Sequence, residues 1–218
     1  MPKHNLPKTK NSLGTNILIL CIVLSLVGLG IVYSLDFFEV PGETRAVETE
    51  ESVEFSIAAS KLHAPKSWIE TQFKPKENML NFLELRLELQ VNGQSNAVNV
   101  TLLPASQAAP SAYLLDALYI HNFASGPSEQ KYGLVVKKLR NEAGFEDETI
   151  WYDALSANPF VAKCLTEKTA PDNAKNCITT VLVNKRVSAL IQFEDSVLPN
   201  WRVFSVALDK QLATLTLN

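Results

Sequence analysis

Two cysteines are the residues of this chain whose type and position most clearly predict chemistry. Cys164 and Cys177 flank a polar, turn-like stretch that contains Pro171-Asp172-Asn173. In an oxidising compartment two such thiols usually pair, and closing a loop of this size stabilises a fold by about 3 kcal/mol in the chain-entropy description. Redox catalysis would need a C-x-x-C spacing and an activated thiolate near a helix start, and neither is visible. We therefore predict a structural disulfide between Cys164 and Cys177.

The other side chains with catalytic potential do not form a recognisable constellation. His63 and His121 lie far apart and outside any H-E-x-x-H motif, so no metal site is expected there. Ser128 and Lys131 match the S-x-x-K motif of penicillin-recognising enzymes, but the companion S-D-N and K-T-G motifs are missing from the sequence. The acids around Glu146 are best interpreted as a solvated connection, because paired catalytic carboxylates need a cleft and a fixed separation. No catalytic, cofactor-binding or metal-ligating residue is predicted.

The composition excludes several classes of protein. The chain has 218 residues with 20 basic and 23 acidic side chains, a formal net charge of −3. A protein held to nucleic acid by phosphate contacts would be strongly basic, so a nucleic-acid partner is not expected. Hydrophobic residues make up 46% of the chain, which is typical of a folded protein, and three cysteines are too few for a disulfide-dense scaffold.

An uncharged apolar segment near the N-terminus predicts a membrane span. Residues 16–35 contain no charged side chain, and a helix over Ile17 to Leu35 would be about 28 Å long, close to the hydrocarbon thickness of a bilayer. Lysines precede it, so residues 1–15 should form a cytoplasmic tail and the rest should lie outside the cytoplasm. A cleaved signal peptide would have a shorter apolar core and a small-residue cleavage site. We therefore predict a transmembrane helix at residues 16–35 that contacts the lipid bilayer.

The part beyond the predicted span divides into a linker and one domain. Acidic residues crowd its start, at Glu43, Glu48, Glu50, Glu51 and Glu54. We interpret residues 36–51 as an acidic linker, since a solvated spacer is the simplest explanation of such a charge run. Residues 52–218 are numerous enough to bury one proper core, and they are predicted to form a β-rich periplasmic domain.

Alternating apolar residues predict antiparallel strands. Leu83 to Gln90 alternates leucine with charged or polar residues, which is the period of two expected for a strand with one wet face. Asn92-Gly93 follows as a strong hairpin signal, so residues 96–103 should return as the partner strand. Further strands are expected at residues 53–58, 115–123, 131–139, 148–152, 160–165, 177–183 and 187–193.

The C-terminus changes to a helical period. Apolar residues recur there at spacings of three and four, at Val197, Trp201, Phe204, Leu208, Leu212 and Leu215. Such a stripe predicts an amphipathic helix that packs on the sheet, with Asp195 or Ser196 as its cap. The predicted fold class is α+β, with an N-terminal transmembrane helix followed by a mostly antiparallel β domain and a C-terminal amphipathic helix.

The last third of the chain carries a resemblance to a protein group. The residues concerned are Trp151-Tyr152, Ser156 to Phe160, Ala162 to Cys164, the run from Cys177 to Phe193, and Trp201. This pattern resembles uncharacterised single-pass, membrane-anchored envelope proteins of alphaproteobacteria. The resemblance implies a bacterial envelope location and brings no known activity with it.

These observations favour a binding protein over an enzyme. The prediction is a single-pass protein of the bacterial inner membrane whose periplasmic domain is a non-enzymatic binding or assembly module. It would have a protein partner in the envelope and no cofactor. Two alternatives stay open. One is a periplasmic cell-envelope hydrolase, for which Ser128, His121 and Glu146 are the residues to replace, and the other is a carrier of a small apolar ligand.

Overall fold

The computed structural model describes residues 51–70, 79–165 and 176–216, all of which belong to one compact unit. The predicted tail at 1–15, the predicted transmembrane helix at 16–35 and the predicted linker up to residue 50 lie outside the described residues. Within the described ranges, no helix combines the length and the apolar character needed to cross a membrane.

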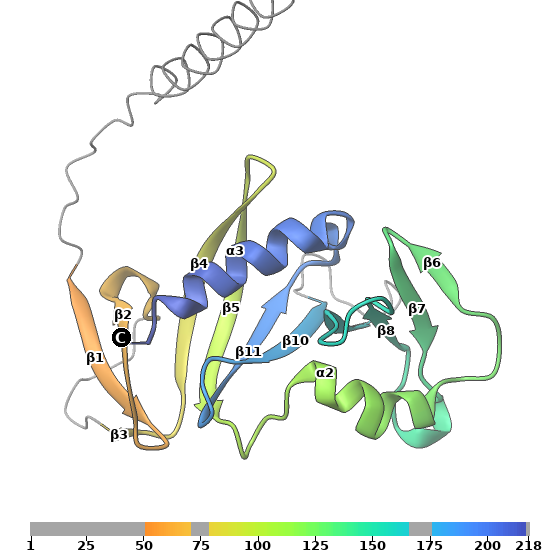
Figure 1. The fold of residues 1–218 in the computed structure, drawn as a ribbon, viewed down its shortest axis with the longest axis horizontal. Coiled ribbons are helices and arrows are strands. Elements are labelled where there is room, and N and C mark those ends of the chain that lie inside the picture. The colour runs from red at the N-terminus through yellow and green to blue at the C-terminus, as the bar shows by residue number, and fades with distance from the viewer. Residues whose placement is uncertain (1–50, 71–78, 166–175, 217–218) are drawn as a thin grey trace, which may run out of the picture. The chain divides into compact units, whose positions relative to one another are not determined.

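The domain is built on one eight-stranded sheet in which every neighbouring pair of strands is antiparallel (Figure 1). The strand order is β4-β5-β11-β10-β9-β8-β7-β6, so that strands β6 to β11 form a meander to which the β4–β5 hairpin is added through β11. The strands are β4 (Leu83–Val91), β5 (Gln94–Pro104), β6 (Glu129–Lys131), β7 (Leu134–Lys138), β8 (Glu148–Tyr152), β9 (Val161–Leu165), β10 (Cys177–Leu182) and β11 (Val187–Phe193). The predicted α+β class with a mostly antiparallel sheet is confirmed.

A second, three-stranded sheet lies at one end of the domain. It has the order β2-β1-β3 and consists of β1 (Ser52–Ile57), β2 (Ser60–Pro65) and β3 (Met79–Leu80), with a short 3-10 turn, η1 (Lys66–Trp68), after β2. Two bridges connect this end to the rest of the domain, Leu62 with Thr216 and Ile69 with Leu85. The small sheet therefore extends the core beyond the end of the C-terminal helix.

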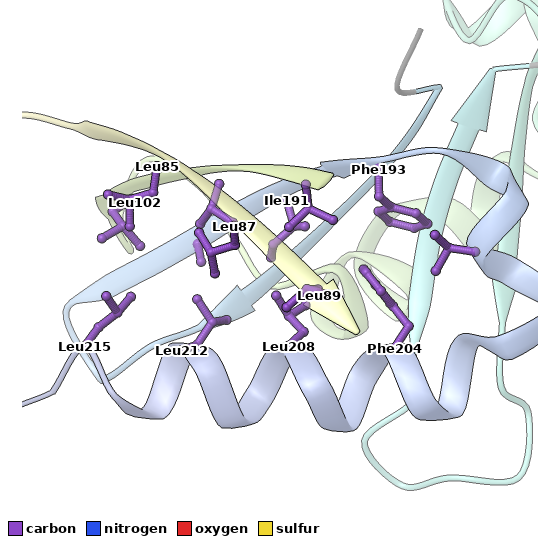
Figure 2. Close-up of a cluster of buried hydrophobic side chains, with 14 of the residues drawn as sticks. Leu85, Leu87, Leu89, Leu102, Ile191, Phe193, Phe204, Leu208, Leu212 and Leu215 are labelled. Carbon is purple, nitrogen blue, oxygen red and sulfur yellow. The ribbon is translucent and has the colours of Figure 1, made fainter. Parts of the chain in front are cut away.

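The C-terminal helix α3 (Trp201–Ala213) covers the leucine face of the β4–β5 hairpin (Figures 1 and 2). Leu85, Leu87 and Leu89 are each about 1% exposed, because the period of two turns all of them toward the helix. Figure 2 shows apolar side chains of α3 and of the turn after it facing them, at Phe204, Leu208 and Leu212 on the helix and at Leu215 beyond it. Burying each of these side chains stabilises the fold by about 1.5–3 kcal/mol, so this layer holds the domain together.

The start of α3 differs from the prediction. Asp195–Asn200 form a 3-10 turn, η5, that contains Pro199, and Asn200 stands at the N-cap of α3. Asp195 and Ser196 are thus not the caps of the α-helix. The residues of the predicted apolar stripe are nevertheless buried, including Val197, which lies in the 3-10 turn.

One predicted strand is wrong and another is incomplete. The predicted strand at 115–123 is helical, formed by α2 (Ser111–Leu114), a π turn η2 (Leu115–Tyr119) and a 3-10 turn η3 (Ile120–Asn122). Its buried residues, Leu115 and Tyr119, are four apart, which is a helical spacing, and they join a second hydrophobic cluster. The predicted strand at 131–139 is instead the β6–β7 hairpin, whose turn residues Tyr132 and Gly133 both have positive φ, at 57° and 77°. Two further strands, β2 and β3, were not predicted.

A 3-10 turn, η4 (Asn141–Ala143), and loops complete the described chain. The core is thus divided between two faces of the main sheet. α3 covers one face at β4, β5 and β11, and the α2–η2 segment packs with Ile150 and Val161 in the second cluster.

Candidate functional site

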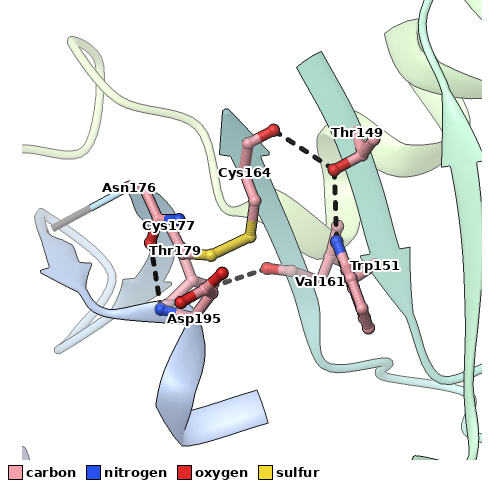
Figure 3. Close-up of a disulfide and its surroundings, with 8 residues drawn as sticks. All are labelled: Thr149, Trp151, Val161, Cys164, Asn176, Cys177, Thr179 and Asp195. Carbon is pink, nitrogen blue, oxygen red and sulfur yellow. Dashed lines mark hydrogen bonds between the residues drawn. A yellow bond between two sulfur atoms is a disulfide. The ribbon is translucent and has the colours of Figure 1, made fainter. Parts of the chain in front are cut away.

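The predicted disulfide is present and lies where β9 meets β10 (Figure 3). Cys164 and Cys177 are register partners on these strands and are 3% and 0% exposed. The bridge sits in a hydrogen-bonded setting, because Thr149 Oγ1 donates to the Cys164 carbonyl at 3.2 Å and accepts from Trp151 Nε1 at 3.1 Å. The disulfide therefore fastens the one end at which the two strands are paired.

Beyond the disulfide the ladder between β9 and β10 ends early. Only Cys177 and Ile178 of β10 are paired with β9, on Cys164 and Lys163. Side chains take over from there, since Thr179 Oγ1 donates to the Val161 carbonyl at 2.7 Å and the Thr180 N–H donates to Ser111 Oγ at 2.8 Å. The strands thus form a fork whose arms are β10 on one side and β9 with the connection 153–160 on the other.

A pocket of about 500 Å³ occupies this fork and opens to solvent; we call it the fork pocket. Both arms, the start of α2 and one face of α3 line it. The α3 residues are Trp201, Ser205, Leu208 and Asp209, whose spacing places them on one side of the helix. The pocket therefore depends on α3 crossing the sheet above the point where the ladder ends.

The polar side chains of the fork pocket are acids, hydroxyls and the amide of Asn158. Asp153 and Asp209 both line it, and no Lys, Arg or His occurs among the described residues of its wall. Burial raises the pKa of the Asp209 carboxyl above its ordinary value. The Oγ atom of Ser205 is buried and has no hydrogen-bond partner within the described part of the chain. The site thus offers two acceptor groups, the Asp209 carboxylate and the Ser205 hydroxyl, that no other described residue engages.

Two aromatic rings are among the groups that line the pocket. Phe160 and Trp201 stack with their centroids 5.3 Å apart. The indole Nε1 of Trp201 donates to the Tyr132 carbonyl at 3.1 Å, so this ring connects the pocket with the β6–β7 hairpin. The guanidinium carbon of Arg202, Cζ, lies 4.4 Å from the centroid of the Trp201 ring.

A second concave surface lies beside that hairpin, with a volume of about 800 Å³; we call it the aromatic groove. Tyr132 and Trp151 stack there at 6.3 Å, and Lys131 Nζ lies 5.1 Å and 5.7 Å from their respective centroids. Tyr132 is 44% exposed. Aromatic side chains with a neighbouring cation are enriched in protein interfaces, so the groove has the composition of a binding surface.

The residues considered from the sequence for catalysis do not build a site. His63 lies on β2, whereas His121, Ser128 and Glu146 are exposed near the other end of the main sheet. No hydrogen bond or ion pair joins their side chains in the described ranges, and none of them lines the fork pocket. In those same ranges no group of three or more His, Cys, Asp or Glu side chains is placed to hold a metal ion.

Sequence reasoning missed the fork pocket itself. Ser205 and Asp209 interrupt the helix with polar groups next to the apolar stripe, four residues apart, and this is the one signal that the sequence carries. A polar side chain next to a buried stripe is usually solvated, so the spacing alone does not distinguish a site.

Comparisons with known proteins place the fold. No family model matches the chain, and no curated protein matches it. Among solved structures, the chain is similar to Smlt3025, an immunity protein of the Stenotrophomonas maltophilia type IV secretion system, with a TM-score of 0.52 and 12% sequence identity. The similarity covers 76% of this chain and 93% of that protein. The domain therefore shares its fold with Smlt3025.

Proposed function

We propose that this chain is a protein-binding module of the bacterial envelope and that it neutralises a protein toxin, as an immunity protein. The observation that carries this proposal is the similarity in fold, which extends over 93% of the immunity protein Smlt3025. An immunity protein acts by binding, so the proposal agrees with the non-enzymatic binding role predicted from the sequence.

The proposed location is the periplasm, with residues 16–35 as the anchor in the inner membrane. The buried Cys164–Cys177 disulfide supports an oxidising compartment, because such bonds persist in the periplasm and are rare in the cytosol. The uncharged run at 16–35, preceded by lysines, supports the anchor and its orientation. Tethering would keep the binder where an incoming toxin meets the membrane.

The surface supports a protein partner. The aromatic groove and the fork pocket meet at Trp201, whose ring lines the pocket and whose Nε1 bonds the Tyr132 carbonyl. Tyr, Trp and Arg supply most hot spots of protein interfaces, and Tyr132, Trp151 and Arg202 lie together here. We assign the toxin-binding surface to this side of the domain.

Site-specific photo-crosslinking in intact cells tests the proposal. A crosslinking amino acid at Tyr132 or Leu182 should capture one partner. The same group at Glu84, on the face of β4 that points away from α3, should not. Production of the captured protein in the periplasm of cells without the chain should stop growth, and co-production of the chain should restore it. Equal capture at all three positions, or a captured protein that is harmless, would overturn the proposal.

A further inference from the structure

We propose that the fork pocket receives a lysine or arginine side chain from an extended segment of the partner protein. This inference rests on the proposed function, because it names the part of the partner that the domain recognises. Three features of the pocket support it, namely its charge, the free backbone of one arm and the apolar residues at its mouth.

Charge complementarity selects a basic side chain. Two carboxylates, of Asp153 and Asp209, face a pocket whose described wall contains no cation. Within the described ranges, no ion pair or hydrogen bond engages the Asp209 carboxylate, while Asp153 Oδ1 accepts the Leu155 N–H at 3.1 Å. An ammonium or guanidinium group would supply the missing donors, and charge-assisted hydrogen bonds of this kind are about twice as strong as neutral ones.

The free backbone of β10 favours an extended segment. The Val183 N–H donates to the Val187 carbonyl on β11, so alternation turns the backbone groups of Thr180 and Leu182 toward the fork. The Thr180 N–H already donates to Ser111 Oγ, and the pairing of β10 with β9 stops at Ile178. The Thr180 carbonyl and the Leu182 backbone can therefore pair with an incoming strand, as in recognition by strand addition.

The mouth of the pocket suits the aliphatic stem of a long basic side chain. Leu182 is 51% exposed and Tyr113 is 64% exposed, and both line the opening. Long basic side chains bury their methylene groups along such surfaces while the charged end reaches polar partners. Phe160 adds apolar surface to the wall with its ring stacked on Trp201, whose ring already has the Arg202 guanidinium 4.4 Å from its centroid. The unpartnered Ser205 hydroxyl adds a further acceptor at the pocket wall.

Peptide selection on the full-length chain in mild detergent tests the inference. Random linear peptides displayed on phage serve as the probe, and the selected peptides should share a lysine or arginine at one position. Replacing that arginine by citrulline, which has nearly the same shape without the charge, should weaken binding at least tenfold in fluorescence anisotropy. The Asp209→Asn variant should lose a similar factor and bind both peptides alike, whereas Asp116→Asn, an exposed acid outside the pocket, should behave as the parent chain.

The outcomes separate this inference from the proposed function. Selected peptides without a basic position, or an Asp209→Asn variant that still prefers arginine to citrulline, would overturn the inference. Full neutralisation of the crosslinked toxin by Asp209→Asn would also overturn it while leaving the proposed function intact. Spermidine that binds as tightly as the selected peptides would show a site for small cations, which likewise overturns the role of an extended segment. Absence of any captured toxin would instead overturn the proposed function.

Discussion

The Nζ atom of Lys163 lies 2.6 Å from Oε1 of Glu148, on neighbouring strands β9 and β8. The two side chains are 29% and 16% exposed, and the second carboxylate oxygen of Glu148 is buried without a hydrogen-bond partner among the described residues. The carboxylate also lies near enough to Tyr119 to influence its ionisation. Lys163 therefore neutralises the Glu148 carboxylate, which would otherwise lie unpaired beside the second hydrophobic cluster.

Removing that lysine should destabilise the domain. We expect Lys163→Met to lower the free energy of unfolding by about 2 kcal/mol, less than for a fully buried pair because both side chains keep some contact with water. Urea denaturation at pH 7 measures the loss. The double variant Lys163→Met/Glu148→Gln should recover most of it, since no charge is then left unpaired, and a double variant as unstable as the single one would contradict this account.

Stability should fall at alkaline pH through Tyr119. Burial and, second, the Glu148 carboxylate raise the pKa of Tyr119 above its ordinary value of 10.0. The folded state then keeps the phenol proton at pH values where the unfolded chain loses it, so the free energy of unfolding decreases as the pH rises above that ordinary value. Urea midpoints measured at rising pH should show this decrease, and it should be smaller in Tyr119→Phe. An identical alkaline slope in both proteins would be evidence against burial of the phenol.

Loss of the disulfide should cost stability without redirecting the fold. We expect Cys164→Ala/Cys177→Ala to unfold at about 3 kcal/mol lower free energy, because the bridge closes a short loop in the unfolded chain. The parent chain should migrate faster unreduced than reduced on a denaturing gel, and the double variant should lose this difference. Cys21→Ala, which changes the cysteine within the uncharged run at residues 16–35, is the control and should keep the difference. Reaction of both Cys164 and Cys177 with an alkylating agent before reduction would contradict the bridge.

The contact between α3 and the sheet should dominate the stability. Phe204 is fully buried, and its ring centroid lies 4.9 Å from that of Phe193. We expect Phe204→Ala to cost about 3–5 kcal/mol through the cavity that it leaves. Val206→Ala, on the same helix but 70% exposed, should change the stability by less than about 0.5 kcal/mol in the same denaturation experiment.

The Asp209 carboxylate of the fork pocket should slightly lower the stability of the domain while the pocket is empty. Burial raises the pKa of Asp209, so folding favours the protonated carboxyl and the charged form present at pH 7 is disfavoured. The free energy of unfolding therefore decreases as the pH rises through the raised pKa, and Asp209→Asn should be more stable than the parent at pH 7. Solvent screening limits the gain to a few tenths of a kcal/mol. The difference should disappear in strong acid, where the parent carboxyl is protonated in both states, and a variant less stable at pH 7 would contradict the expected sign.

Local patterns predicted the elements whose own residues specify them. Leucine alternation and Asn92-Gly93 define the β4–β5 hairpin, where the structure pairs Leu83 through Val91 with the returning strand. Two other hairpins turn at Ala58-Ala59 and Tyr132-Gly133, again with positive φ at both residues. Alanine and tyrosine rarely adopt that conformation, so tertiary packing imposes these turns and β2 and β6 could not be identified from the sequence.

The disulfide was predictable and the site around it was not. Two cysteines separated by a short polar stretch of sequence indicate their bond through local spacing. The fork pocket depends on the point at which the β9–β10 ladder stops and on the passage of α3 above it. Ser111, Asp153, Thr180 and Asp209 come together there from distant parts of the chain. Their approach follows from the strand order, which single-sequence patterns do not determine.

The strand order has a consequence for how the chain must be protected while it is being made. Strand β5 ends at Pro104 and pairs with β11, where Val187 is its register partner, and α3, which covers the leucine face of the hairpin, follows near the C-terminus. At the usual speed of synthesis the intervening chain takes roughly 5–20 s to appear. During that interval the side chains of Leu85, Leu87 and Leu89 are exposed apolar surface rather than part of the core. The nascent protein should therefore depend on holdase chaperones until its last helix has emerged.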